Sequence, residues 1–284
     1  MTDPRPNPGA PAWSDPFLDR AQLQPRHPSP FQFDRERAWG GATGRGVTVA
    51  VIDSGIDATH PAVGPISQSI SVQRVGEEVE VNEHAEPGDL VGHGTACAGI
   101  IRSIAPEADL ISVRVLGPNN RASGVAFAHA LNWAVEHGIG VVNLSLSSRS
   151  EDLYAVFHEL ADDAYFGNTL LVAAASNTPG EASYPALFSS VVSVASHDVA
   201  DPWTFFYNPK PPVEFGAWGM DVPVAWLGGG TLIASGNSFA APHIAGLAAL
   251  IRSKHPTLTA FELKSVLAAV ATPVSDQGRD GEEK

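Results

Sequence analysis

Apolar residues in this chain gather in five nearly unbroken runs, separated by polar or helix-like stretches. Each run is short and rich in β-branched residues. Runs of this kind are typical of strands that are buried on both faces of a parallel sheet. We therefore predict strands at VTVAVID (47–53), LISVRVL (110–116), IGVVNLSL (139–146), TLLVAAA (169–175) and VVSVAS (191–196).

Helical patterns alternate with these runs, at 124–137, 151–166 and 238–253. Strands that alternate with helices are usually joined by right-handed crossovers, which place helices on both faces of the sheet. The pattern therefore predicts one α/β domain with three layers, in which helices cover both faces of a mostly parallel central sheet.

The two ends of the chain differ in composition from this domain. Eight prolines lie within the first 30 residues, a density that prevents helix formation and sheet pairing. We expect a Pro-rich N-terminal extension over 1–38, a folded domain over 39–275 and a polar C-terminal tail over 276–284. The extension is expected to pack on the domain or to cross its cleft, because it cannot bury a core of its own.

The net charge and the lengths of the apolar runs indicate which kinds of molecule the protein could bind. Acidic residues outnumber basic ones by 31 to 17, which gives a formal net charge of −14. Nucleic-acid binding needs clustered Lys and Arg, so that class is excluded, whereas a basic peptide is favoured. No stretch approaches the roughly 20 apolar residues that span a bilayer. The oligomeric state leaves no signal in the sequence.

The N-terminus and the cysteine count bear on location. No apolar run follows a positive cluster at the N-terminus, so we expect no secretory signal and a cytoplasmic protein. Cys97 is the one cysteine, which excludes an internal disulfide.

Asp53 and His93 are the first candidate catalytic residues. Asp53 ends the first predicted strand, and functional groups gather at the carboxyl ends of strands in open α/β sheets. His93 lies in GHGTACAG, where glycines on both sides allow a close approach of the backbone. Taken singly, Asp53 fits the start of a turn and His93 fits a structural histidine. His60 and His243 fit packing or hydrogen-bonding roles.

Ser238 and Asn177 complete the set. Ser238 stands in SGNSFAAPHIAG before a long helix, where serine and asparagine are also common N-caps. A helix N-terminus supplies N–H groups that stabilise an oxyanion, so capping and catalysis are compatible there. Asn177 follows the predicted strand 169–175, where it suits either an Asx turn or donation to a substrate carbonyl.

Together these segments resemble the subtilisin-like serine proteases over residues 39–272. VAVIDSGID is similar to the family's aspartate motif, GHGTACAG to its histidine motif and SGNSFAAPHIAG to its serine motif. Their order is the subtilisin order. VAAASN resembles the strand that carries the family's oxyanion asparagine, and SYPALFSSVVSVAS follows at a similar interval. Cys97 matches a variant that occurs in proteinase K-like members.

The resemblance implies a subtilisin-like fold and a serine endopeptidase that selectively processes a peptide or protein substrate. Ser238 would be the nucleophile, His93 the general base and Asp53 the group that orients the imidazole. Asn177 and the Ser238 N–H would form the oxyanion hole. Cys97 would pack beneath the histidine as a buried thiol.

Peptide-binding residues also follow from the resemblance. The two edges expected to hold substrate are Ser145, Leu146 and Ser147 on one side and Asn120, Arg121 and Ala122 on the other. Ser183 stands where the family often has glycine, which implies a narrower pocket for the residue before the cleaved bond.

One departure keeps a second hypothesis open. Asn237 stands where the family usually has threonine, and it could donate to the oxyanion or serve only as a cap. The alternative is therefore a catalytically weak subtilase fold that binds peptides.

No cofactor is expected. A metal site built from Asp53, His60 and His93 lacks any recognised ligand spacing. The family's calcium loop is missing after the histidine motif, and Ala62 occupies the place of a ligand carboxylate. The acidic residues Glu77, Glu78 and Glu80 fit a solvated run of charge.

Overall fold

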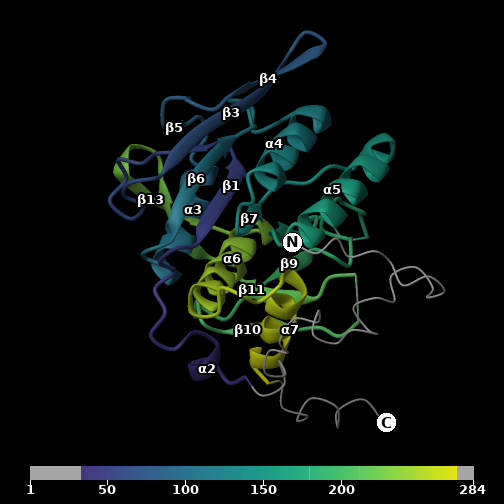
Figure 1. Ribbon diagram of the computed structural model, residues 1–284. Coiled ribbons are helices and arrows are strands. Elements are labelled where there is room, and N and C mark those ends of the chain that lie inside the picture. Colours follow the sequence, from purple (N-terminus) through teal and green to yellow (C-terminus); the bar gives the residue numbers. More distant parts are fainter. Residues whose placement is uncertain (1–32, 179, 211, 274–284) are drawn as a thin grey trace, which may run out of the picture.

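The computed structural model describes residues 33–178, 180–210 and 212–273, so most of the predicted extension and the whole predicted tail lie outside the described residues. Within that part, nine strands form one sheet in the order β10-β11-β9-β8-β7-β1-β6-β3-β4 (Figure 1). Pairing is parallel from β11 through to β3, and only the outer pairs β10–β11 and β3–β4 are antiparallel. The strands of this sheet are β1 (Thr48–Asp53), β3 (Gln68–Val75), β4 (Glu78–Asn82), β6 (Asp109–Arg114), β7 (Val141–Leu144), β8 (Leu170–Ala174), β9 (Val192–His197), β10 (Phe205–Tyr207) and β11 (Phe215–Trp218).

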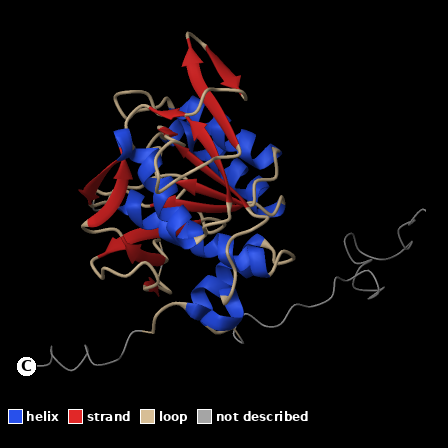
Figure 2. Ribbon diagram, turned by 90° about the vertical axis from the view of Figure 1, so that its left-hand side faces the viewer, coloured by secondary structure: helices blue, strands red, loops and turns tan. Residues whose placement is uncertain are grey.

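Helices surround this sheet, as Figure 2 shows in blue around the red strands. They are α2 (Arg35–Trp39), α3 (His93–Ile104), α4 (Gly124–Glu136), α5 (Tyr154–Phe166), α6 (Asn237–Lys254) and α7 (Ala260–Val270), with short 3₁₀ turns η3 (Glu151–Leu153) and η4 (Leu227–Gly229). Two small antiparallel pairs are β2 (Gly55–Ile56) with β5 (Gly88–Asp89), and β12 (Val222–Trp226) with β13 (Gly230–Ala234). None of the helices in the described ranges is long and apolar enough to cross a membrane.

The central strand β1 shows how the core is divided between the two faces. Successive side chains of a strand point to opposite faces. Val49 and Val51 therefore pack with α3, α6 and α7, whereas Ala50 and Ile52 pack with α4 and α5. All four side chains are fully buried. This burial on both faces explains why the apolar runs are unbroken, and the predicted three-layer α/β fold is confirmed.

The five predicted strands and three predicted helices are present with shifted ends. The run predicted as 110–116 leaves the sheet after Arg114, because the N–H groups of Val115 and Leu116 both donate to the Asp53 carbonyl. The run 139–146 ends as a paired strand at Leu144. The helix predicted from residue 151 starts as the 3₁₀ turn η3 and becomes α-helical at Tyr154.

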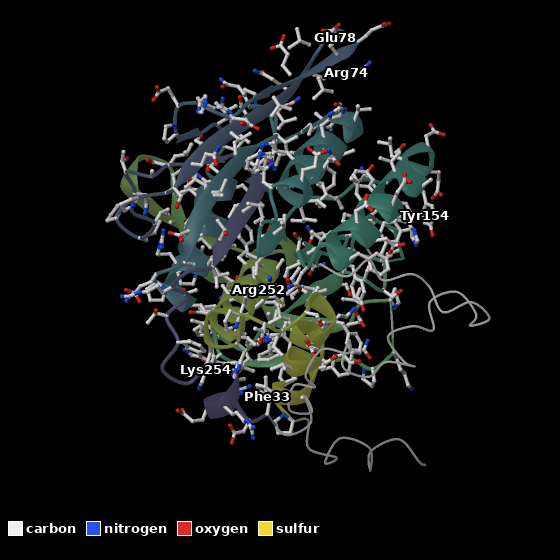
Figure 3. The ribbon with its side chains drawn as sticks, viewed as in Figure 1. Phe33, Arg74, Glu78, Tyr154, Arg252 and Lys254 are labelled. Carbon is white, nitrogen blue, oxygen red and sulfur yellow. The ribbon has the colours of Figure 1, made fainter. Side chains whose placement is uncertain are left out.

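The hairpin β3–β4 and the helix α7 are additional elements that the hydrophobic pattern did not reveal. The outward half of β3 and most of β4 are exposed, so they carry no apolar run. Figure 3 shows Arg74 and Glu78 at the projecting end of this hairpin. The acidic run that includes Glu78 and Glu80 therefore lies on an edge strand, where charge discourages pairing with another chain.

Helix α2 ties the N-terminal side of the described chain to the end of α6. The Lys254 ammonium donates to the carbonyls of Glu36 and Gly40, and the Phe33 ring packs edge-on against His255 at 5.1 Å. Lys254 and Phe33 lie in the same region of Figure 3. Residues 33–38, which the sequence assigned to the extension, therefore pack on the domain.

The close packing of α3 on α6 yields a first prediction. A Cβ atom at Gly246 of α6 would lie 2.9 Å from the Cβ of Ile104 in α3, so the two backbones leave no room for a side chain. Gly246→Val should therefore lower the free energy of unfolding by about 1–3 kcal/mol, the usual cost of overpacking a core. Urea denaturation measures this change.

The matched control is His129→Val, which places the same side chain on an exposed position of α4. It should cost no more than about 0.5 kcal/mol through helix propensity. Equal effects of the two substitutions would contradict a tight α3–α6 contact.

Candidate active site

Asp53 occupies the carboxyl end of the central strand β1 and is fully buried. One of its carboxylate oxygens accepts the Ser54 N–H at 2.7 Å. The carboxylate also lies 2.8 Å from Nδ1 of His93. A buried carboxylate needs such partners, because desolvation without them is costly. The bond to Asp53 places the His93 proton on Nδ1 and leaves Nε2 as the acceptor.

His93 is the first residue of α3, and the glycines beside it are required by packing. Gly92 has a positive φ of 105°, and a Cβ there would lie 2.8 Å from the Trp226 ring. A Cβ at Gly94 would meet the Gly55 carbonyl oxygen at 2.0 Å. Gly94 therefore lets the start of α3 pack against β2, and Gly92 lets it pack against Trp226 at the end of β12, which together bring the imidazole to the end of β1.

Asp89 is a positioning residue that the sequence reasoning missed. Its carboxylate accepts the N–H groups of Val91, Gly92 and Thr95 and the hydroxyls of Thr95 and Ser54. These bonds satisfy the donors at the start of α3 in place of an N-cap side chain. The signal in the sequence was an aspartate three residues before Gly92, at the start of the histidine motif.

Burial and charge compete at His93. Burial disfavours the imidazolium and by itself would lower the pKa of His93. The charge and the hydrogen bond of the adjacent Asp53 carboxylate raise it, and the net result is a pKa well above 6.5. Cys97 lies one turn further along α3, fully buried, with its sulfur 3.8 Å from an Asp53 oxygen. Burial raises the pKa of the Cys97 thiol, so it stays protonated and is no nucleophile.

Ser238 lies in the first turn of α6 and is not its N-cap, as one interpretation of the sequence had it. The helix starts at Asn237, and Gly236 is the N-cap residue. The Ser238 carbonyl accepts the hydroxyl of Ser145 at 2.8 Å, and that hydroxyl accepts the Asn143 amide at 3.0 Å. The end of β7 is thereby linked to the serine.

Asn177 and Asn237 hold each other in fixed orientations. The Asn177 side-chain oxygen accepts the Asn237 N–H at 2.9 Å, and Asn177 and Ser238 line the same cleft. The Asn237 amide donates to the carbonyls of Ala175 and Ser176, and its oxygen accepts the Ser196 N–H. Both expectations for Asn237 are therefore wrong: its side chain neither caps α6 nor is left to donate to an oxyanion.

One cleft of about 700 Å³ collects the predicted site residues. Its lining includes His93, Asn177, Ser238 and the expected peptide-binding residues Asn120, Arg121, Ala122, Ser145, Leu146 and Ser147. Asp53 lies behind His93, beneath the surface of the cleft. Ser145 contributes differently from its expected role, because its hydroxyl is turned to the Ser238 carbonyl. Ser183 is buried and outside the lining, so it does not narrow the cleft directly.

His60 and His243, the other two histidines considered in the sequence, are engaged elsewhere. His60 uses Nε2 toward the Gly230 carbonyl and Nδ1 toward the Ala62 N–H, so it is no ligand beside Asp53. His243 bonds the Phe239 carbonyl, and burial lowers its pKa to about 4. Across the described part of the chain, the metal-competent grouping is Asp53, His93 and Cys97, whose ligand atoms lie within 4.8 Å of one another.

The bonds of Asn237 yield a second prediction. Asn237→Thr removes the amide that donates to the carbonyls of Ala175 and Ser176, and a threonine hydroxyl cannot replace both bonds. The free energy of unfolding should fall by about 1–3 kcal/mol, as expected for partly buried polar groups left without partners. Chemical denaturation checks this, with Asn132→Thr on the half-exposed face of α4 as the control. Wild-type stability of Asn237→Thr would contradict the assigned bonds.

Comparison with known proteins identifies the family of the chain. The model of the subtilase family (Peptidase_S8) matches residues 44–283. Subtilisin Savinase from Lederbergia lenta is 32% identical over 242 residues, which cover 82% of this chain and 86% of that protein. A thermostable alkaline protease from Halalkalibacterium halodurans is also 32% identical over 242 residues, but the chain spans only 64% of its length.

Solved structures give the same result. The crystal structure of a cold-adapted subtilisin-like serine proteinase superposes with a TM-score of 0.68 at 27% sequence identity, and the match covers 81% of this chain and 83% of that one. A psychrophilic protease, S41, gives the same TM-score and identity over 83% of this chain and 88% of its own. The chain belongs to the subtilase family.

Proposed function

We propose that the protein is a serine endopeptidase in which Ser238, His93 and Asp53 form the catalytic triad. The observation that carries this proposal is the buried Asp53 carboxylate bonded to Nδ1 of His93, in the same cleft as Ser238. The substrate is a peptide or protein, which the chain processes selectively.

The reaction would start when the Ser238 hydroxyl attacks the peptide carbonyl and passes its proton to Nε2 of His93. Asp53 stabilises the imidazolium that results and keeps the ring in its tautomer. His93 then returns the proton to the leaving amine. Water hydrolyses the acyl-enzyme by the same route, with His93 again acting as base.

The tetrahedral oxyanion would be met by the Asn177 amide and the Ser238 N–H. The bond from the Asn237 N–H to the Asn177 oxygen supports this role, because it orients the amide before substrate arrives. Residues 145–147 continue past the paired part of β7, and residues 120–122 form the facing edge of the cleft, so an extended peptide would lie between them.

The alternative of a catalytically weak, peptide-binding subtilase fold rested on Asn237. It is not favoured, because the Asn237 side chain bonds the backbone of neighbouring strands. The Asn237 amide donates to the carbonyls of Ala175 and Ser176, which follow β8. An asparagine at this position therefore has a role in packing that is compatible with catalysis. The cytoplasmic location remains a prediction.

Ser238→Ala tests the nucleophile. Peptide hydrolysis and covalent labelling by a fluorophosphonate should both be lost, while the unfolding transition stays where it is, because the hydroxyl is needed for chemistry and not for packing. Asn177→Ala should lower kcat by about 10²–10³ with little change in KM, since the amide meets charge that exists only in the transition state. Turnover by Ser238→Ala near the wild-type rate would refute the assignment.

The pH dependence follows from the raised pKa of His93. The imidazole must be neutral to accept the serine proton, so kcat/KM should fall as pH drops through a pKa above 6.5. The midpoint therefore lies higher than the reference imidazole value alone would suggest. A pH–rate profile of kcat/KM measures this, and an acid limb centred below pH 6.5 would contradict the electrostatic account.

A further inference from the structure

An ion pair joins the two walls of the cleft beside Ser238. Arg149 follows the wall that begins at Ser145, and Glu181 follows the wall that carries Asn177. Nη1 of Arg149 lies 2.6 Å from Oε1 of Glu181, and both residues line the cleft. The pair therefore borders the same cleft as Ser238 and Asn177.

The backbone keeps these two residues close. Ser148 and Tyr184 form an isolated antiparallel bridge, in which each N–H donates to the other's carbonyl at 2.9 and 2.8 Å. Arg149 is the neighbour of Ser148, and Glu181 stands three residues before Tyr184. The bridge therefore holds the two backbone segments side by side, so that these side chains are within reach of each other.

The two charges are held unequally. The Glu181 side chain is 28% exposed, and its second oxygen accepts the Ser176 hydroxyl at 2.7 Å. Bonds from Arg149 and then Ser176 lower the pKa of Glu181, which keeps it ionised at neutral pH. Arg149 is 68% exposed, so water can solvate its guanidinium when the pair opens. The Glu181 carboxylate is therefore held in place, whereas another cation could replace the Arg149 guanidinium.

We propose that Glu181 selects a lysine or arginine side chain in the residue whose carbonyl Ser238 attacks. This inference rests on the proposed function. The substrate cation would replace Arg149 on the Glu181 carboxylate, and Arg149 would turn into solvent. Charge is conserved at the pair, so the carboxylate never lacks a partner. The formal net charge of −14 also attracts cationic peptides.

The test compares kcat/KM for three peptides that differ only in the residue before the scissile bond, which is lysine, leucine or glutamate. The lysine peptide should be the best substrate. In Glu181→Gln its kcat/KM should fall by about tenfold or more, as expected for a lost charged hydrogen bond, while the leucine peptide stays within about threefold. Fluorophosphonate titration gives the concentration of active enzyme.

Two further variants separate the contributions of the charges. Arg149→Ala should raise kcat/KM for the lysine peptide, because Glu181 no longer needs to exchange a partner. Arg121→Ala removes an equal charge from the opposite edge of the same cleft and should not raise the ratio of lysine to leucine cleavage. Glu181→Lys should move the preference toward the glutamate peptide.

Two results would overturn the inference. A preference for the glutamate peptide that Arg149→Ala abolishes would make Arg149 the determinant. An equal loss for all three peptides in Glu181→Gln would make Glu181 a structural residue. Neither result touches the proposed function, which fails instead if wild type cleaves no peptide, if Ser238 takes no fluorophosphonate label or if Ser238→Ala keeps its turnover.

Discussion

The site depends on burying the Asp53 carboxylate without leaving it unpaired. A lone buried carboxylate would be protonated or would admit water. Here the Ser54 N–H and Nδ1 of His93 share its two oxygens. To make that contact, α3 must start against β2 and against Trp226, and Gly94 and Gly92 respectively leave the room for these two contacts. The central strand, the glycines beside His93 and the start of α3 thus all contribute to pairing the buried Asp53 carboxylate.

Hydrogen bonds beneath the cleft extend this constraint to the other elements. The Ser145 hydroxyl bridges the end of β7 and the Ser238 carbonyl, and the Cys97 thiol lies 3.3 Å from the same hydroxyl. On the far side, Asn237 fastens the start of α6 to the ends of β8 and β9. Hydrogen bonds therefore join the carboxyl ends of the parallel strands to the start of one helix around Ser238.

The protonation state that serves chemistry is not the one that contributes most to stability. The raised pKa of His93 means that the charged pair with Asp53 stabilises the fold below the unfolded pKa of the imidazole, and this contribution is lost as pH rises through the folded pKa. In the proposed mechanism, activity needs the neutral imidazole and so rises over the pH range in which that contribution is lost. At a pH where the imidazole is neutral, the fold therefore lacks the stabilisation that the charged His93–Asp53 pair provides.

Much of the fold could be predicted because the central strands are buried on both faces. Strands such as β1 carry unbroken apolar runs, and their ends point to Asp53 and Asn177. The hairpin β3–β4 could not be found in this way, because its apolar residues, Ile70 and Val72 in β3 and Val79 and Val81 in β4, alternate with polar ones and form no unbroken run. The roles of Asp89 and Asn237 also escaped prediction. The amide of Asn237 bonds carbonyls more than 60 positions away, which only the folded chain brings near. Asp89 bonds the nearby N–H groups at the start of α3, but its link to the Ser54 hydroxyl spans 35 positions.

The central claim is that buried Asp53 holds the His93 proton on Nδ1 and raises its affinity for a second proton. The most direct measurement is a pH titration by NMR of the protein labelled with ¹⁵N in its histidine rings. The account predicts that the neutral ring carries its proton on Nδ1, that this proton resonates far downfield, and that the ring titrates with a pKa above 6.5. A neutral ring protonated on Nε2, or a pKa at or below 6.5, would contradict it.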